Sequence, residues 1–195
     1  NLFALVFSIL MIPVIAMEVP ADGTTVTISD DESSIEWTGK KVTGEHSGTI
    51  SLKSGEMKIE EGQLVGGQFV IDMTSIKNTD LSGEYKGKLE GHLKSDDFFG
   101  VAKYPEASFV MTNVKTSKAK GSYEVTGDLT IKGITHPISF TTTVAKDGNK
   151  YISVAKITVD RAKYDVRYGS GSFFDNLGDK TIYDEFDLNI RLVSE

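Results

Sequence analysis

Apolar and polar residues alternate with a period of two in run after run along this chain. The pattern repeats about nine times after residue 22, and side chains in a β-strand point alternately to its two faces. Each run therefore predicts a half-buried strand. The runs occupy 33–41, 49–53, 56–60, 68–73, 107–113, 123–131, 137–144, 151–161 and 185–193.

Turn sequences that contain glycine separate these runs. Short turns of this kind join neighbouring strands as antiparallel hairpins, and the chain lacks the strand–helix alternation of a parallel sheet. The sequence therefore predicts an all-β, antiparallel architecture. The clearest turn signals are Ser54-Gly55, Glu61-Gly62, Lys132-Gly133 and Asp147-Gly148-Asn149.

Two segments depart from the strand pattern. Tyr85, Leu89 and Leu93 recur at helical spacing and predict a helix over 82–99, while a shorter helical or looped segment is expected at 172–179.

Antiparallel strands in this number leave exposed edges unless the sheet closes, so we predict an eight-stranded barrel. A sandwich of two sheets is the alternative, because periodicity alone does not separate the two architectures.

The first 17 residues are uncharged and almost wholly apolar. The stretch is shorter than the roughly 20 apolar residues that span a membrane, and it fits the apolar core of a secretory signal. We therefore predict a signal peptide at 1–21, cleaved after Ala16 or Ala21, and one domain at 22–195. An uncleaved anchor and a buried first helix are the alternatives.

Charge and composition exclude several classes of function. The formal net charge is −7, from 21 basic and 28 acidic residues, which argues against nucleic-acid binding and against electrostatic docking on anionic membranes. The chain has no cysteine, which excludes disulfides and Cys-ligated zinc. His46, His92 and His136 fit no metal-binding motif, and no nucleophile elbow or nucleotide-binding loop occurs. We therefore expect no catalytic residues, no metal and no cofactor.

Several short motifs follow one another along the chain. They are FVIDMTSI at 69–76, GHLKSDDFF at 91–99, YPEASF at 104–109, VTGDLTIKGIT at 125–135, Asp160-Arg161, and YGSG at 168–171. In this order they resemble the YceI-like family of exported bacterial lipid-binding proteins, over nearly the whole chain after the signal segment. The resemblance implies an extended lipocalin-like barrel with a helix packed at its side, a periplasmic or secreted location, and no assigned catalytic activity.

The resemblance also implies a ligand and partners. The ligand would be a polyisoprenoid, an isoprenoid quinone or another long-chain lipid in an apolar interior, and the partners would be a membrane in transient contact and a second copy in a homodimer. The inward strand phase supplies candidate lining residues, although each by itself fits a packed core better, and their assignment to a lipid site rests on the resemblance. They are Trp37, Met57, Ile59, Phe69, Ile71, Phe109, Met111, Leu129, Ile131, Phe140 and Val159.

Two polar residues complete the predicted site. Arg161 shares the strand phase of Val159, so it is expected to point inward near a strand end, where a guanidinium could meet a polar head group. Tyr164 stands where the family often has a tryptophan after the Asp-Arg pair, and it could add a hydrogen bond. The alternative for Arg161 is an internal ion pair with Asp72, Asp128 or Asp160.

We therefore predict a protein that binds, stores or transports a long apolar lipid and is not an enzyme. One alternative is an enzyme that acts on a small apolar substrate inside the barrel, which a cluster of Asp72, Arg161 and a histidine would support. Another is an exported interaction domain with a filled core, which a solid interior would support.

Overall fold

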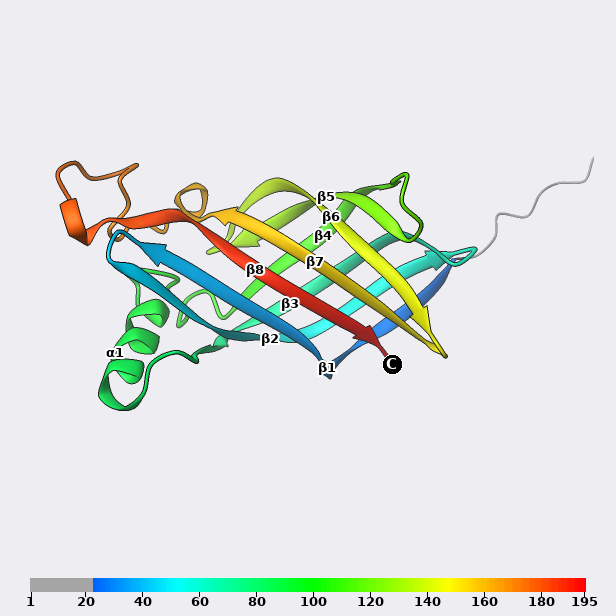
Figure 1. The fold of residues 1–195 in the computed structure, drawn as a ribbon, viewed down its shortest axis with the longest axis horizontal. Coiled ribbons are helices and arrows are strands. Elements are labelled where there is room, and N and C mark those ends of the chain that lie inside the picture. Colours follow the sequence, from blue (N-terminus) through cyan, green and yellow to red (C-terminus); the bar gives the residue numbers. More distant parts are fainter. Residues whose placement is uncertain (1–22) are drawn as a thin grey trace, which may run out of the picture.

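The structure, a computed structural model, describes residues 23–195. These residues form a closed barrel of antiparallel strands with one α-helix and two short 3₁₀ helices in its connections (Figure 1). The predicted signal peptide at 1–21 lies outside the described residues and stays a prediction. The strands are β1 (Thr24–Lys41), β2 (Gly44–Glu60), β3 (Gln63–Asn78), β4 (Glu106–Thr116), β5 (Ser122–Ile131), β6 (Ile134–Asp147), β7 (Lys150–Asp160) and β8 (Ile182–Ser194). The helices are α1 (Gly83–Lys94), η1 (Arg161–Tyr164) and η2 (Gly178–Lys180).

The first and last strands close the barrel. Trp37 of β1 lies opposite Gly48 of β2 on one side and opposite Leu188 of β8 on the other. Each strand from β2 to β7 pairs with its two neighbours in the sequence. Closure leaves the sheet without free outer strands. The predicted eight-stranded barrel is therefore confirmed, and the two-sheet sandwich is wrong.

One predicted turn is a bulge. The runs at 49–53 and 56–60 form the single strand β2, whose register against β3 shifts between Leu52 and Ser54. A Cβ atom at Gly55 would lie 2.7 Å from Cδ1 of Phe69, so the glycine admits an aromatic ring rather than a chain reversal. Glu61-Gly62 does form a tight hairpin turn, with φ of 49° and 77°.

The two ends of the barrel differ (Figure 1). One end, which we call the helix end, carries α1 and the connection 161–181 between β7 and β8. The other, which we call the turn end, carries the β2–β3, β4–β5 and β6–β7 turns and the C-terminus. The barrel wall is less continuous at the helix end, because β6 pairs with β7 only over residues 142–147. The connections there take over part of the enclosure.

Polar contacts and the partly buried Leu93 hold α1 against the barrel. None of its residues is fully buried. The fully buried Asn78 donates its backbone N–H to Oε1 of Glu90 in α1 (2.8 Å) and its side-chain amide to the carbonyl of Ser47 (2.9 Å). The helix ends earlier than predicted, because both the N–H and the hydroxyl of Ser95 donate to the carbonyl of His92.

An acidic side chain beside Asn78 makes this corner sensitive to pH. Asp80 forms hydrogen bonds with Nδ1 of His46 (2.8 Å), with the Ser47 N–H (2.9 Å) and with the Asn78 amide. Burial acts to raise the pKa of the Asp80 carboxyl, but these hydrogen bonds outweigh it and lower the pKa to about 2. The carboxylate therefore stabilises the fold above its ordinary pKa of 3.8, and this contribution is lost as the pH falls towards 2.

We expect Asp80→Asn to flatten the acid-dependent loss of stability, because the neutral amide has no proton to take up in this range. Urea unfolding of the parent protein and the variant, compared between about pH 4 and pH 2, measures the effect. Asp97→Asn is the control, since Asp97 is an exposed carboxylate. Equal acid sensitivity of the parent and Asp80→Asn would contradict the assignment.

Candidate ligand-binding cavity

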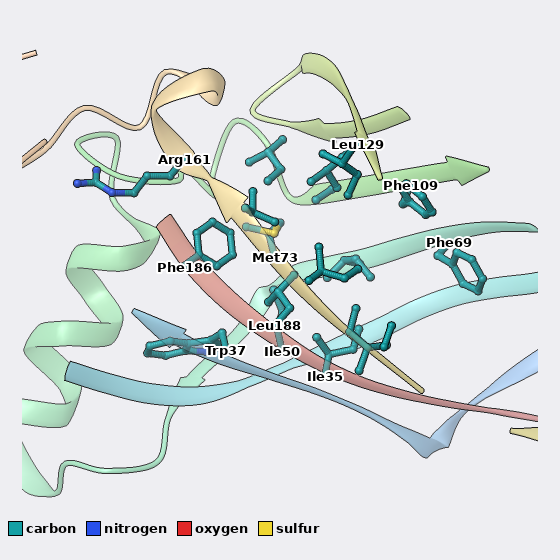
Figure 2. A pocket seen from close by; sticks show the side chains of 18 of the residues that line it. Ile35, Trp37, Ile50, Phe69, Met73, Phe109, Leu129, Arg161, Phe186 and Leu188 are labelled. Carbon is teal, nitrogen blue, oxygen red and sulfur yellow. The ribbon is translucent and has the colours of Figure 1, made fainter. Parts of the chain in front are cut away.

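A largely apolar cavity occupies the part of the barrel interior next to the helix end (Figure 2). Its volume is about 200 Å³, whereas a site for one water molecule needs roughly 10–15 Å³ by a comparable measure. All eight strands contribute side chains to the wall, and Leu93 of α1, the turn after it and Arg161 of η1 contribute the rest. The barrel is therefore hollow over part of its length.

The interior towards the turn end is filled instead. Met57 and Val125 are each 1% exposed there, within a buried cluster that also includes side chains from β1, β3, β6 and β8. Protein cores of this kind pack without voids for a ligand. The cavity therefore ends blind against this cluster. The other members of the buried cluster include Ile28, Ile59, Leu64, Tyr123 and Val144.

Glycines on neighbouring strands let aromatic rings lie close against the cavity wall. A Cβ atom at Gly48 would lie 2.5 Å from Cζ2 of Trp37, and one at Gly127 would lie 2.4 Å from Cζ of Phe109. A Cβ atom would also meet a neighbouring backbone carbonyl, that of Lys77 at Gly48 and that of Val110 at Gly127, so any larger residue would displace the strand as well as the ring. Both rings line the cavity, so these glycines help to keep it open.

Aromatic side chains from several connections meet at the helix end. His92 of α1 contacts both Tyr168 and Phe98, with ring centroids 4.3 and 5.6 Å apart. Phe98 in turn contacts Phe99 at 5.0 Å, and the guanidinium of Arg161 lies 5.2 Å from the Phe98 ring. Phe98, Phe99 and Arg161 all line the cavity. These contacts form the wall at the mouth of the cavity.

Arg161 is buried and joins the connection 161–181 to β8. It donates to the backbone carbonyls of Val166 (2.7 Å), Ile182 (3.0 Å) and Tyr183 (3.2 Å). Its ion-pair partner is Asp184, with Nη2 and Oδ1 3.4 Å apart. Burial lowers the pKa of the guanidinium, and Asp184 and Asp160 oppose that change. Arg161 also lines the cavity.

The expected partners of Arg161 need correction. The ion pair is with Asp184, and not with Asp72, Asp128 or Asp160, because β8 brings residue 184 alongside the start of η1. Asp72 instead accepts hydrogen bonds from the N–H (2.9 Å) and hydroxyl (2.6 Å) of Thr74. The cluster of Asp72, Arg161 and a histidine that would support an enzyme is therefore not assembled.

The other polar groups in the wall, apart from the half-exposed Tyr183, are satisfied within the protein. The hydroxyls of Thr142 and Ser153 bond to each other at 2.9 Å, and Trp37 donates its indole N–H to the carbonyl of Thr49 at 3.3 Å. A polar group that is already hydrogen-bonded gains little from a further bond to water or to a polar ligand atom. The wall therefore behaves as an apolar surface along most of its length.

Polar atoms without a hydrogen-bond partner gather at the helix end. Within residues 23–195, the buried side-chain atoms in this state are Nε2 of His92, the hydroxyl of Tyr164 and Oδ1 of Asp184, the last of which is ion-paired with Arg161 without forming a hydrogen bond. Burial, helped by the charge of Asp160, raises the pKa of the Tyr164 phenol, which keeps it neutral. The unused hydrogen-bonding capacity of the interior therefore lies at this end.

Most of the predicted site residues come together in the cavity wall. Figure 2 shows Trp37, Phe69, Phe109, Leu129 and Arg161 arranged along it, with Arg161 at the end near η1. The other predicted residues in the wall are Ile71, Met111, Ile131, Phe140 and Val159.

Three predicted residues lie outside the cavity wall. Met57 and Ile59 have the inward strand phase but belong to the filled cluster at the turn end. Tyr164 is 1% exposed within η1, where its ring meets His136 edge-on at 5.4 Å. Their role in ligand binding stays a prediction.

The cavity wall also contains residues that were not among the predicted site residues. Phe186, Leu188 and Ile190 share one phase of the run at 185–193, so the alternation could have identified them. Phe98 and Phe99 follow α1 in a turn, where no periodic signal exists. Their place in the wall depends on how the connection folds back over the barrel end.

Within the described residues, no group of three or more His, Cys, Asp or Glu side chains is placed to hold a metal ion. The helices of this part of the chain are also too short or too polar for any of them to cross a membrane.

A closed antiparallel barrel that is filled at one end and holds an apolar cavity at the other has the architecture of lipocalin-like binding proteins. The family comparison agrees with this class. The chain belongs to the YceI-like domain family, whose model matches residues 26–194.

Curated relatives match part of the chain. A UPF0312 protein of Pseudomonas putida strain W619 is 49% identical over 57 residues, which are 29% of each chain. A UPF0312 protein of Vibrio parahaemolyticus is 32% identical over 104 residues, which are 52% of this chain and 51% of the relative. The matched segments thus span between about three tenths and one half of these relatives' length.

Solved structures share the fold at low sequence identity. Burkholderia cenocepacia BcnA superposes with a TM-score of 0.70 at 23% identity, covering 86% of this chain and 99% of that one. A polyisoprenoid-binding domain from Saccharophagus degradans gives 0.61 at 16% identity, covering 87% and 97%. A YceI protein of Campylobacter jejuni gives 0.54 at 21% identity, covering 80% and 84%.

Proposed function

We propose that the protein binds a long apolar lipid in this cavity and stores or transports it, without catalysing a reaction. The observation that carries the proposal is the apolar cavity, which all eight strands line and whose polar groups are mostly satisfied internally. Such a wall favours hydrocarbon, because burial of apolar surface contributes roughly 25 cal/mol per Å² before ordering costs.

The lipid classes that fit are polyisoprenoids, isoprenoid quinones and other long-chain amphiphiles. The Saccharophagus degradans relative is described as a polyisoprenoid-binding domain, which supports the first class. The hydrocarbon chain of the lipid would extend towards the filled end of the barrel, and its head group would lie at the helix end near Arg161. The guanidinium has five N–H groups, and three backbone carbonyls accept from it while Asp184 balances its charge. Arg161 therefore serves the mouth of the cavity mainly as a structural residue.

The cellular setting is part of the proposal. A protein with the predicted signal peptide acts in the periplasm or outside the cell, where a lipid needs a carrier to cross water. We also propose that the protein forms a homodimer, as the family resemblance implies, and the molar mass in solution measures this directly.

We expect the protein purified from a bacterial host to carry a lipid. Native mass spectrometry should show a reproducible adduct of several hundred daltons, the mass of an isoprenoid or fatty chain. Solvent extraction of the same sample would then release a prenyl or long-chain compound. A bare protein mass, together with no uptake of added polyprenyl lipid or quinone, would contradict the proposal.

A further inference from the structure

The exposed aromatic side chains of the barrel lie at one end. Within residues 23–195, the aromatic residues that are more than a third exposed belong to α1, to the two connections at the helix end and to the start of β8. We call this set the aromatic collar. It consists of Tyr85, Tyr104, Tyr168, Phe173, Phe174 and Tyr183.

The collar differs from the scattered apolar residues found on any protein surface. Of the four exposed valines, Val65, Val110 and Val154 lie on separate strands along the barrel, and Val42 lies in the β1–β2 turn. Phe173 and Phe174, 40% and 50% exposed, are adjacent in the connection 161–181, which projects beyond the strands in Figure 1. At similar fractional exposure a phenylalanine presents more apolar surface than a valine, and here two of them are adjacent.

The collar is continuous with the mouth of the cavity. Tyr183 lines the cavity and is also 50% exposed, so one side chain belongs to both surfaces. Tyr168 contacts His92, which contacts the cavity-lining Phe98. Whatever covers the collar therefore faces the opening through which a lipid would pass.

We infer that the helix end docks on the surface of a lipid bilayer through the aromatic collar. Four of its members are tyrosines, whose apolar rings and polar hydroxyls suit the level of the lipid head groups. The collar is spread over several connections rather than one flat face, so each ring can enter a fluid surface by itself. Docking of this kind presents the cavity mouth to the acyl chains.

Charge determines which bilayer the collar fits. Around Phe173 and Phe174 the connection carries Arg167 and Lys180 together with acidic residues, and the whole chain has a net charge of −7. Anionic lipid would therefore gain little from this surface. The partner is a zwitterionic bilayer, bound weakly enough for release. Passage of lipid into the cavity rests on the proposed function, whereas docking itself does not.

The absence of cysteine allows a site-specific test in the full chain. A Phe174→Cys variant and a Val154→Cys variant each receive one environment-sensitive fluorophore, and phosphatidylcholine vesicles are added. Val154 is a matched control, because it is 45% exposed but lies on the barrel wall. We expect a blue shift and an intensity gain at position 174 only, unchanged by added salt. Because each label reports its own position, attachment of the chain by its apolar first residues does not imitate this result.

A second substitution measures the contribution of the neighbouring ring. Phe173→Ser, added to the labelled Phe174→Cys variant, should weaken vesicle binding by about tenfold, the effect of losing one buried aromatic side chain. The inference is overturned if neither label responds, if both respond equally, or if the response requires anionic vesicles and disappears with salt. It is also overturned if the signal at position 174 rises with protein concentration alone, which would indicate a second copy. A lipid adduct without vesicle docking would leave the proposed function standing and reject docking.

Discussion

Replacement of Arg161 by methionine should lower the free energy of unfolding by about 3–5 kcal/mol. The substitution removes the donor to the carbonyls of Val166, Ile182 and Tyr183 and leaves the carboxylate of Asp184 without its cation. Each buried acceptor without a donor costs about 1–3 kcal/mol, partly recovered where water can enter. A loss of this size is a large fraction of the roughly 5–15 kcal/mol that stabilises a typical domain. Urea unfolding followed by circular dichroism measures it.

Two further variants give this prediction its controls. Arg167→Met removes an arginine whose side chain is 60% exposed and whose partner is Asp165, so its cost should stay below about 1 kcal/mol. Arg161→Lys keeps the charge but has no planar fork to reach the three carbonyls together, so an intermediate loss is expected. If Arg161→Met is as stable as Arg167→Met, the guanidinium does not hold the mouth of the barrel together.

The strands could be predicted from the sequence because each depends on a local pattern. Alternation identifies the face that a residue occupies, and hairpin turns such as Glu61-Gly62 can be recognised from their residue types. The error at Ser54-Gly55 has a physical cause, since glycine serves turns and close approaches alike. Only the position of the Phe69 ring distinguishes the two uses. Pairing of β1 with β8, which closes the barrel, joins residues too distant for any local signal.

Part of the cavity wall could also be predicted, because the strand alternation identifies which side chains point inward. Period two indicates that Met57 and Phe69 both point inward, but it carries no information on depth along the barrel axis. Both belong to the filled cluster, but only Phe69 also reaches the cavity wall. The strand phase of Arg161 predicts that it points inward. Its ion pair with Asp184 depends on the path of the connection 161–181, which no local pattern indicates. The parts of the site that periodicity missed are those built by connections.

The turn end and the helix end of the barrel have different roles in the proposed function. Strand pairing and the packed cluster make the turn end a rigid base, since close-packed interiors resist deformation. The helix end depends on side-chain contacts, such as those of Asn78 with Glu90 and of Arg161 with Ile182. Segments held by few contacts open at lower free-energy cost than a strand core. Exchange of a lipid is therefore expected at the helix end.

Filling the cavity should abolish lipid retention while leaving the barrel folded. Ala155 of β7 lines the cavity, and in Ala155→Trp the large side chain would occupy the space that a lipid chain needs. Extra volume in a packed core costs about 1–3 kcal/mol, and empty space beside Ala155 should place this variant near the lower limit. Native mass spectrometry of the purified variant should show the protein without an adduct, and titration with a polyprenyl lipid should show at least about a tenfold loss of affinity.

The neighbouring residue supplies the control for this experiment. Val154 is 45% exposed, so Val154→Trp adds the same side chain to the outside of the same strand and should leave lipid retention unchanged. Ala107→Phe, on β4, narrows the cavity from another strand and should reproduce the loss. Thermal unfolding of each variant separates loss of binding from loss of fold. A folded Ala155→Trp protein that retains lipid as the parent does would mean that the ligand lies elsewhere, because a tryptophan and a lipid chain cannot share this part of the cavity.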